Sequence, residues 1–201
     1  MQGLADGYFV LPYTIGDYLS KDIRTGKIPT DTKEFDQAEN EVKDRINKLM
    51  SGSGERSVDY YHKTLGKIMW NKCGMSRNEK DLKEAIEEIS ALREDFWNNV
   101  KVPGTKDTLN QELEKAGRVA DFLELGELFA KDALDRRESC GGHFREESVE
   151  LDGAQKGEAL RDDKNFKYVS AWEYKGAPKE ALLHKEELNF ENIELKTRSY
   201  K

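Results

Sequence analysis

The side chains most able to do chemistry gather in one short stretch of the chain. Arg137, Ser139, Cys140, His143 and Arg145 fall within nine positions. A cysteine and a histidine three residues apart can act as a nucleophile and its base. Nothing in this stretch supplies a third group to orient the histidine, or an oxyanion site. The pattern therefore does not favour nucleophilic catalysis by these residues.

This stretch closes the longest helical pattern in the sequence, which begins near Leu109. The apolar residues that recur along it at helical spacing are Leu113, Ala116, Ala120, Leu123, Phe129, Ala130, Ala133 and Leu134. Arg136 and Arg137 would lie in the last turn, where positive charge complements the helix dipole. Gly141 and Gly142 would then supply the left-handed conformation that ends many helices. A Gly-Gly turn also lets the backbone approach another group closely.

Three further helices are predicted before it. The same spacing indicates helices at about residues 32–50, 57–72 and 78–100. The expected apolar face of the first comprises Phe35, Ala38, Val42, Ile46 and Leu49. Because the connections are short, we expect an antiparallel bundle of three to four helices.

The two ends of the chain have different patterns. Residues 1–22 are apolar and aromatic but interrupted by glycine and proline, which is typical of a short broken helix packed on a core. Residues 165–174 are β-prone, and 181–184 would pair with them as a hairpin. A last edge strand is expected within 188–195. The fold class is therefore mainly α, with a small C-terminal β (α+β) extension.

Composition restricts the partners of the chain. Among 201 residues the net charge is −7, so a nucleic-acid partner is not expected. No stretch approaches the roughly 20 apolar residues that span a bilayer, and no basic region precedes an apolar run as in a signal peptide. Two cysteines do not form a disulfide framework, which indicates a reduced, intracellular setting. His62 and His184 stand without ligands at metal-binding spacing, so no metal site is expected.

Residues 136–143 carry a family resemblance. Their sequence, Arg-Arg-Glu-Ser-Cys-Gly-Gly-His, resembles the R-K-E-S-R-G-A/G-H signature of the flavoprotein subunits of succinate dehydrogenase and fumarate reductase. Four other stretches resemble the same family in chain order: residues 1–19, 75–77, 110–125, and 161–166 with 198–200. The resemblance thus covers nearly the whole chain. Cys140 departs from the signature, which has arginine there.

The resemblance implies an activity and partners for the intact protein. It implies interconversion of succinate and fumarate, with hydride passing between the substrate and a covalently bound FAD. Electrons would pass to an iron–sulfur subunit, with a membrane anchor subunit beyond it. The expected place is the cytoplasmic side of the bacterial inner membrane, held there through partner subunits. Either direction of the reaction is compatible with the sequence. The related L-aspartate oxidases remain an alternative, although the C-terminal region favours the dehydrogenase and reductase branch.

The resemblance also implies which parts lie elsewhere. The flavin-binding fold of the family begins with a G-x-G-x-x-G/A turn, which this sequence lacks. The family's flavin-attaching, substrate-binding and proton-donating residues lie upstream of the resembling region. We therefore expect an exit segment from a missing N-terminal FAD-binding domain (1–30), a helical bundle domain (31–147) and a small β-rich domain (148–201). Such a fragment would be soluble, would hold no FAD and would be inactive alone.

No residue of this chain is accordingly predicted to be catalytic, cofactor-binding or metal-binding. Arg137, Ser139, His143 and Arg145 are the candidates for fixing the turn against the flavin domain. A second hypothesis remains open, because composition and periodicity fit equally well a stand-alone helical interaction module without catalytic function.

Overall fold

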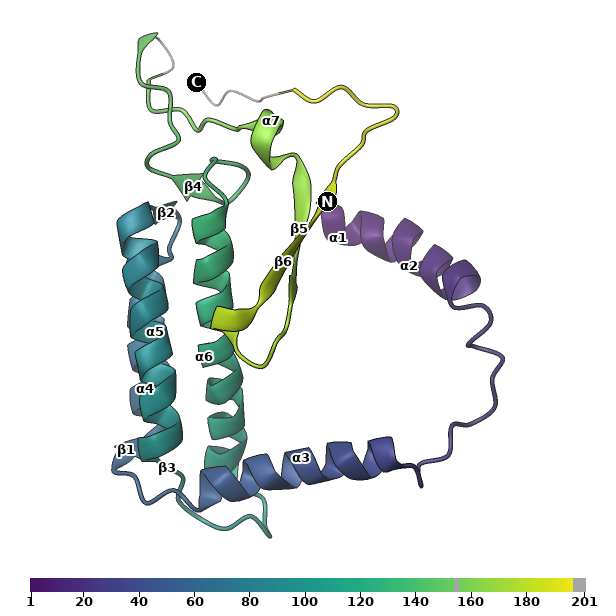
Figure 1. Ribbon diagram of the computed structural model, residues 1–201, viewed down its shortest axis with the longest axis vertical. Helices are drawn as coiled ribbons and strands as arrows, with labels where there is room; N and C mark the ends of the chain where they lie inside the picture. Colours follow the sequence, from purple (N-terminus) through teal and green to yellow (C-terminus); the bar gives the residue numbers. More distant parts are fainter. Residues whose placement is uncertain (154–155, 197–201) are drawn as a thin grey trace. The chain divides into compact units, whose positions relative to one another are not determined.

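The computed structural model describes residues 1–153 and 156–196, so the family-like ending at residues 198–200 lies outside the described residues. The chain divides into two compact units, Met1–Asp44 and Arg45–Lys201 (Figure 1). Among the described helices, none combines the length and the apolar character needed to cross a membrane.

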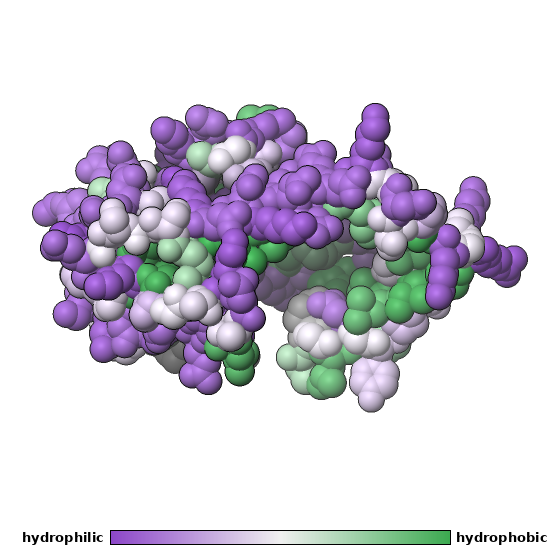
Figure 2. Space-filling view, turned by 90° about the horizontal axis from the view of Figure 1, so that it is seen from below, coloured by the Kyte–Doolittle hydropathy of each residue, from purple (hydrophilic) through white to green (hydrophobic). Residues whose placement is uncertain are grey.

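The first unit begins with four consecutive helical segments. They are α1 (Gln2–Ala5), the π-helical η1 (Asp6–Val10), α2 (Leu11–Tyr13) and the π-helical η2 (Thr14–Tyr18). The segment is helical as predicted, but it passes from α to π helix without a break, since the residues at each junction keep α-helical φ and ψ. Tyr8, Tyr13 and Tyr18 are all largely exposed, and Figure 2 shows hydrophobic side chains gathered on this segment.

Helix α3 (Lys33–Met50) begins in the first unit and ends in the second. Of its predicted apolar face, Leu49, in the last turn, is buried in the core of the second unit, whereas Phe35 and Val42 belong to the first unit. Helical spacing places these residues on one side of the helix, but it does not say whether another element covers that side.

The core of the second unit lies between three long helices, which lie side by side in Figure 1. They are α4 (Val58–Lys72), α5 (Glu79–Asn99) and α6 (Gln111–Asp135). The largest fully buried apolar side chains are Tyr61, Phe96, Leu82, Ile89, Leu123, Val58 and Val119. All of them lie within the helices predicted at about residues 57–72, at about 78–100 and from Leu109 onwards, so the mainly α prediction is confirmed.

Short strand pairs fix the ends of these helices. β1 (Arg56–Ser57) pairs with β3 (Val100–Lys101), which brings the start of α4 beside the end of α5. At the opposite end β2 (Ser76–Arg77) pairs with β4 (Phe144–Arg145), which follows α6. Helix α5 therefore runs antiparallel to both α4 and α6.

Side-chain caps explain where the three helices begin. Ser57, Asn78 and Asn110 each accept a hydrogen bond from the backbone N–H three residues later. Such caps satisfy one of the free N–H groups at a helix start. The predicted starts of α4 and α5 agree with these caps to within about one residue.

The end of α6 differs from the prediction. The helix stops at Asp135, and Arg136 is already extended, with φ −82° and ψ 101°. Arg136 and Arg137 therefore lie outside the last turn, and Gly141 is too far along the chain to cap the helix. Arg145 bonds the last carbonyls of α6 instead, as described below.

A hairpin forms the C-terminal extension. β5 (Tyr168–Glu173) pairs antiparallel with β6 (Leu182–Glu187), as predicted. The strand starts later than expected because Asp162 caps a short helix, α7 (Asp163–Phe166). The hairpin is tied to α6, since Trp172 Nε1 donates to Asp132 at 2.7 Å and Lys131 donates to the carbonyl of Pro178, in η4 (Pro178–Glu180), at 3.0 Å. The expected edge strand within 188–195 is absent from the described residues.

Candidate functional site: the turn after helix α6

The family-like stretch folds as a tight turn beyond the end of α6. Cys140 and His143 exchange both backbone hydrogen bonds, at 2.9 and 3.1 Å. Gly141 occupies the first central position with φ +60°. A positive φ at this position favours glycine, because other residues meet steric strain there. The turn therefore reverses the chain and returns it towards α6.

Arg145 is the central side chain of the returning segment. It is only 2% exposed. Its Nη1 donates to the carbonyl oxygens of Ala133 at 3.1 Å, Leu134 at 3.3 Å and Arg136 at 3.3 Å. These carbonyls belong to the end of α6, where the helix itself leaves them without partners. The guanidinium thus caps the helix and places positive charge at the negative end of its dipole.

Ser139 holds the backbone of Arg145 in place. Its hydroxyl accepts from the Arg145 N–H at 2.8 Å and donates to the Arg145 carbonyl oxygen at 3.2 Å. Ser139 is itself buried. Both hydrogen-bonding capacities of the hydroxyl are therefore used inside the protein, and the two sides of the turn are held together at this point.

His143 links the turn to the connection between α4 and α5. Its Nδ1 lies 2.7 Å from Arg77 Nη1, and its Nε2 lies 2.8 Å from the Arg136 carbonyl oxygen. A guanidinium can only donate, so Nδ1 must accept and Nε2 must carry the proton. Burial, together with the charges of Arg77, Arg145 and Arg136, lowers the pKa of His143, although its bond to the Arg136 carbonyl opposes this. The imidazole is therefore held neutral.

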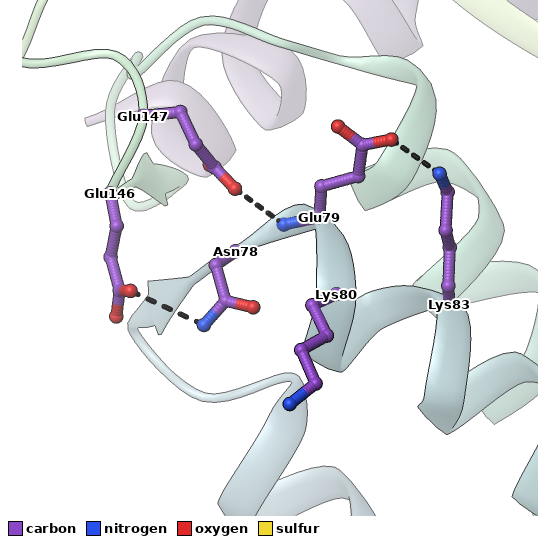
Figure 3. Close-up of a pocket in the computed structure, with 6 residues that line it drawn as sticks. All are labelled: Asn78, Glu79, Lys80, Lys83, Glu146 and Glu147. Atoms are coloured by element: carbon purple, nitrogen blue, oxygen red, sulfur yellow. Dashed lines mark hydrogen bonds and ion pairs between the residues drawn. The ribbon is translucent and has the colours of Figure 1, made fainter.

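Two carboxylates extend the network to neighbouring elements. Buried Glu138 accepts from Arg136 Nη1 and from the Asp162 N–H, both at 2.7 Å, which ties the turn to the segment before α7. Glu147 accepts from Arg145 Nε at 3.1 Å and from the Glu79 N–H, at the start of α5, at 2.6 Å (Figure 3). Burial raises the pKa of Glu147, but these hydrogen bonds outweigh it and the pKa is lowered. It remains a carboxylate near neutral pH.

The Cys140–His143 pair does not form a nucleophile and base. Both ring nitrogens of His143 are already engaged, by Arg77 and by the Arg136 carbonyl. Cys140 is exposed on the outer side of the turn as a free thiol. Within the described residues, nothing in the geometry gives the thiol a base.

Three of the four candidate residues meet at the turn. Ser139, His143 and Arg145 point inwards and share partners, whereas Arg137 is exposed and its side chain has no ion pair among the described residues. Only the backbone of Arg137 takes part, since its carbonyl accepts from Ser148 Oγ at 2.5 Å.

Sequence reasoning missed the partners of these residues. Arg77 stands 66 positions before His143, and only its place in a family-like turn could have drawn attention to it. Glu138 and Glu147 were hidden by the abundance of acidic residues. Within the described parts of the chain, no group of His, Cys, Asp and Glu is arranged to hold a metal ion. The network is suited to fixing backbone geometry.

Comparisons with known proteins agree with the resemblance. The family described as the fumarate reductase flavoprotein C-terminal region matches residues 62–200, well over half of the chain. The fumarate reductase flavoprotein subunit of Proteus vulgaris is 28% identical over 153 residues, which are 75% of this chain and 24% of that protein. An uncharacterized FAD-dependent oxidoreductase of Methanocaldococcus jannaschii is 33% identical over 113 residues, 56% of this chain and 20% of the relative.

Solved structures show the same fold. A quinol–fumarate reductase with menaquinol molecules matches with a TM-score of 0.69 and 22% identity, over 86% of this chain and 28% of that chain. The Escherichia coli quinol–fumarate reductase matches with a TM-score of 0.66 and 20% identity, over 87% of this chain and 28% of that chain. The chain thus spans about a quarter of the length of these proteins. From the family match over residues 62–200, this chain belongs to the family of C-terminal domains of fumarate reductase flavoproteins.

Proposed function

We propose that this chain is the supporting C-terminal domain of a flavoprotein that interconverts succinate and fumarate. The flavoprotein would carry FAD in a separate N-terminal domain and pass electrons to an iron–sulfur subunit. A membrane anchor subunit would hold the assembly at the cytoplasmic side of the inner membrane. The observation that carries this proposal is the family match over residues 62–200. The names of the relatives, fumarate reductase flavoprotein subunits, supply the substrate.

The described residues do not fit an FAD site of the dinucleotide-binding type. Their sheets have two strands each, and no glycine-rich G-x-G-x-x-G turn occurs in the sequence. That turn would bring backbone N–H groups to the pyrophosphate. We therefore assign no residue of this chain to FAD and no chemical step to this chain.

The function that we assign to the turn is mechanical. Ser139, His143 and Arg145 fix its inner side through buried hydrogen bonds. Arg137 and Cys140 face outwards and are free to contact a neighbouring domain. Held in this way, the turn presents one defined surface to the flavin-binding domain.

The exposed N-terminal segment is in keeping with a missing neighbour. Large apolar side chains crowd it: Tyr8, Phe9, Val10, Leu11, Tyr13 and Ile15 are all exposed. Contiguous exposed apolar surface of this kind usually marks an interaction site. We propose that it packs against the flavin-binding domain.

The proposal can be tested by isolating the chain with its natural partners. An affinity tag placed at its C-terminus in its own cells should isolate covalently attached flavin, on the same polypeptide or on a retained one, visible by fluorescence after denaturation. An iron–sulfur polypeptide should be retained with it. If the chain is isolated with partners that contain neither flavin nor iron, the stand-alone interaction module becomes the better account.

The role of the turn needs a separate variant. His143→Ala in the flavin-bearing protein removes the link between Arg77 and the end of α6, so we expect lower turnover and lower flavin content. Arg118→Ala alters an exposed side chain of α6 that takes no part in the turn and serves as the control. Normal turnover and flavin content in His143→Ala would show that this role is wrong.

A further inference from the structure

Arg77 differs from nearly all the arginines around it in lacking a carboxylate. Nine arginines lie between residues 45 and 196. Ion pairs with carboxylates engage seven of them: Arg45, Arg56, Arg93, Arg118, Arg136, Arg145 and Arg161. The other two are Arg137, which is exposed to solvent, and Arg77, which is half-buried.

The known partners of Arg77 leave its charge uncompensated. Its Nε donates to the Gly74 carbonyl at 2.7 Å and its Nη1 donates to the neutral His143. Burial lowers its pKa. A partly desolvated cation is costly unless an opposite charge is supplied. Among the described residues, no carboxylate supplies it.

Arg77 also lies at one end of an apolar groove. Its guanidinium carbon is 4.9 Å from the centre of the Phe129 ring. The groove, of about 300 Å³, runs along the seam between α4 and α6. We call it the α4–α6 groove; its apolar lining includes Leu65, Met69, Phe122, Leu125 and Phe129.

The groove is open although its walls are apolar. Phe122, Leu125 and Phe129 are 42%, 60% and 45% exposed. The groove is deep at Gly126 because this residue has no side chain. A Cβ added to Gly126 would lie 3.3 Å from Leu65 Cδ1, on the opposite wall. From Phe122 to Phe129 the rise along the helix is roughly 10 Å, or two turns. This length suits a short amphipathic helix with apolar residues at i, i+3 or i+4, and i+7.

We propose that the α4–α6 groove binds an amphipathic helix of the flavin-binding domain, and that a carboxylate of this helix pairs with Arg77. This inference rests on the function proposed above. The apolar walls would bury the apolar face of that helix, and the carboxylate would compensate the positive charge of Arg77. Because Arg77 also bonds His143, the same contact would couple the docked domain to the turn after α6.

Gly66 provides a test that leaves the core intact. It is exposed in α4 and lines the groove, and an added Cβ there would meet nothing within 4 Å. The photoreactive residue p-benzoylphenylalanine placed at Gly66 in the flavin-bearing protein should cross-link, on irradiation, to a segment of the flavin-binding domain that contains an acidic residue. The same residue placed at Lys67, which is exposed one position further along the helix, should not give this product.

A substitution supplies the second measurement. Gly66→Trp should fill the groove and lower the melting temperature of the flavin-bearing protein by roughly 5 °C, while this chain alone melts no lower than before, since a glycine inside a helix is itself unfavourable. Lys67→Trp should change neither. A flavin-bearing protein that gives no cross-link from position 66, or gives one to a second copy of this chain, overturns this inference alone. A protein isolated without flavin overturns the proposed function and, with it, this occupant of the groove.

Discussion

Replacing Arg145 with methionine should remove the cap of α6 and destabilise the second unit. Methionine keeps much of the apolar stem but leaves the carbonyls of Ala133 and Leu134 without this donor, and the Arg136 carbonyl with His143 alone. A hydrogen bond to a charged group contributes about 1.5–3 kcal/mol, and removing one partner of a buried ion pair costs about 3–5 kcal/mol.

These contributions overlap, because one Nη1 serves all three carbonyls and Glu147 is partly exposed. We therefore expect Arg145→Met to lower the free energy of unfolding by about 2–4 kcal/mol, less than the loss of a fully buried pair. With a urea dependence of about 2 kcal/mol per M, the midpoint would fall by roughly 1–2 M. Urea titration followed by far-ultraviolet circular dichroism measures this shift.

Two further variants make the test specific. Arg118→Met removes an exposed arginine of the same helix, which pairs with Glu114, and exposed pairs contribute about 0.2–1 kcal/mol. Arg145→Lys keeps the charge with fewer donors and should fall between the wild type and Arg145→Met. If Arg145→Met and Arg118→Met unfold at similar urea concentrations, the argument that Arg145 replaces a glycine cap is wrong.

Three other predictions concern the same region. Ser139→Ala should lower the free energy of unfolding by about 1–3 kcal/mol, because it leaves the buried Arg145 N–H unpaired; Ser148→Ala, at an outer bond of the turn, should have a smaller effect in the same titration. The free energy of unfolding should fall as the pH drops below about 6.5, which is the pKa of a histidine in the unfolded chain. Between this pH and the lower pKa of His143 in the folded protein, only the unfolded state binds the proton. His143→Gln should remove this part of the pH dependence. If the unfolding free energy of the variant still changes with pH at the same slope, His143 is not its source. In the native protein one thiol, Cys140, should react quickly with Ellman's reagent, whereas Cys73, whose pKa is raised by burial, should react only on unfolding; two fast thiols would contradict the burial of Cys73.

Short-range patterns predict much of this fold. The spacing of apolar residues gives α4, α5 and α6, because each packs a continuous stripe on the same core. Side-chain caps at Ser57 and Asn78 lie where the sequence places the helix starts. The hairpin follows from two β-prone runs separated by a turn.

Contacts between distant residues explain what the sequence did not predict. The end of α6 is decided by Arg145, ten positions beyond Asp135, and not by the nearer glycines. Phe129 belongs to the apolar pattern of α6 but lines the open groove instead of the core. Glu127, 1% exposed, has a carboxylate oxygen 3.0 Å from Arg93 Nη2, between α6 and α5. A polar residue at a core position gives no apolar signal, so only its partner on α5 accounts for it.

The candidate site shows the same division. The sequence identifies the stretch from Arg137 to Arg145 by its residue types and its family resemblance. It does not separate the inward side chains from the outward Arg137, and it does not connect His143 with Arg77. That connection requires β2 and β4 to pair, which depends on the packing of all three helices.

The central claim is that this chain supports a flavoenzyme without itself carrying the flavin. The most direct test compares the visible absorption spectrum and the succinate–fumarate turnover of two samples: this chain alone, and the complex that it forms in its own cells. The account predicts a colourless, inactive chain and a yellow complex that interconverts succinate and fumarate. A complex without flavin absorbance and without turnover would contradict it.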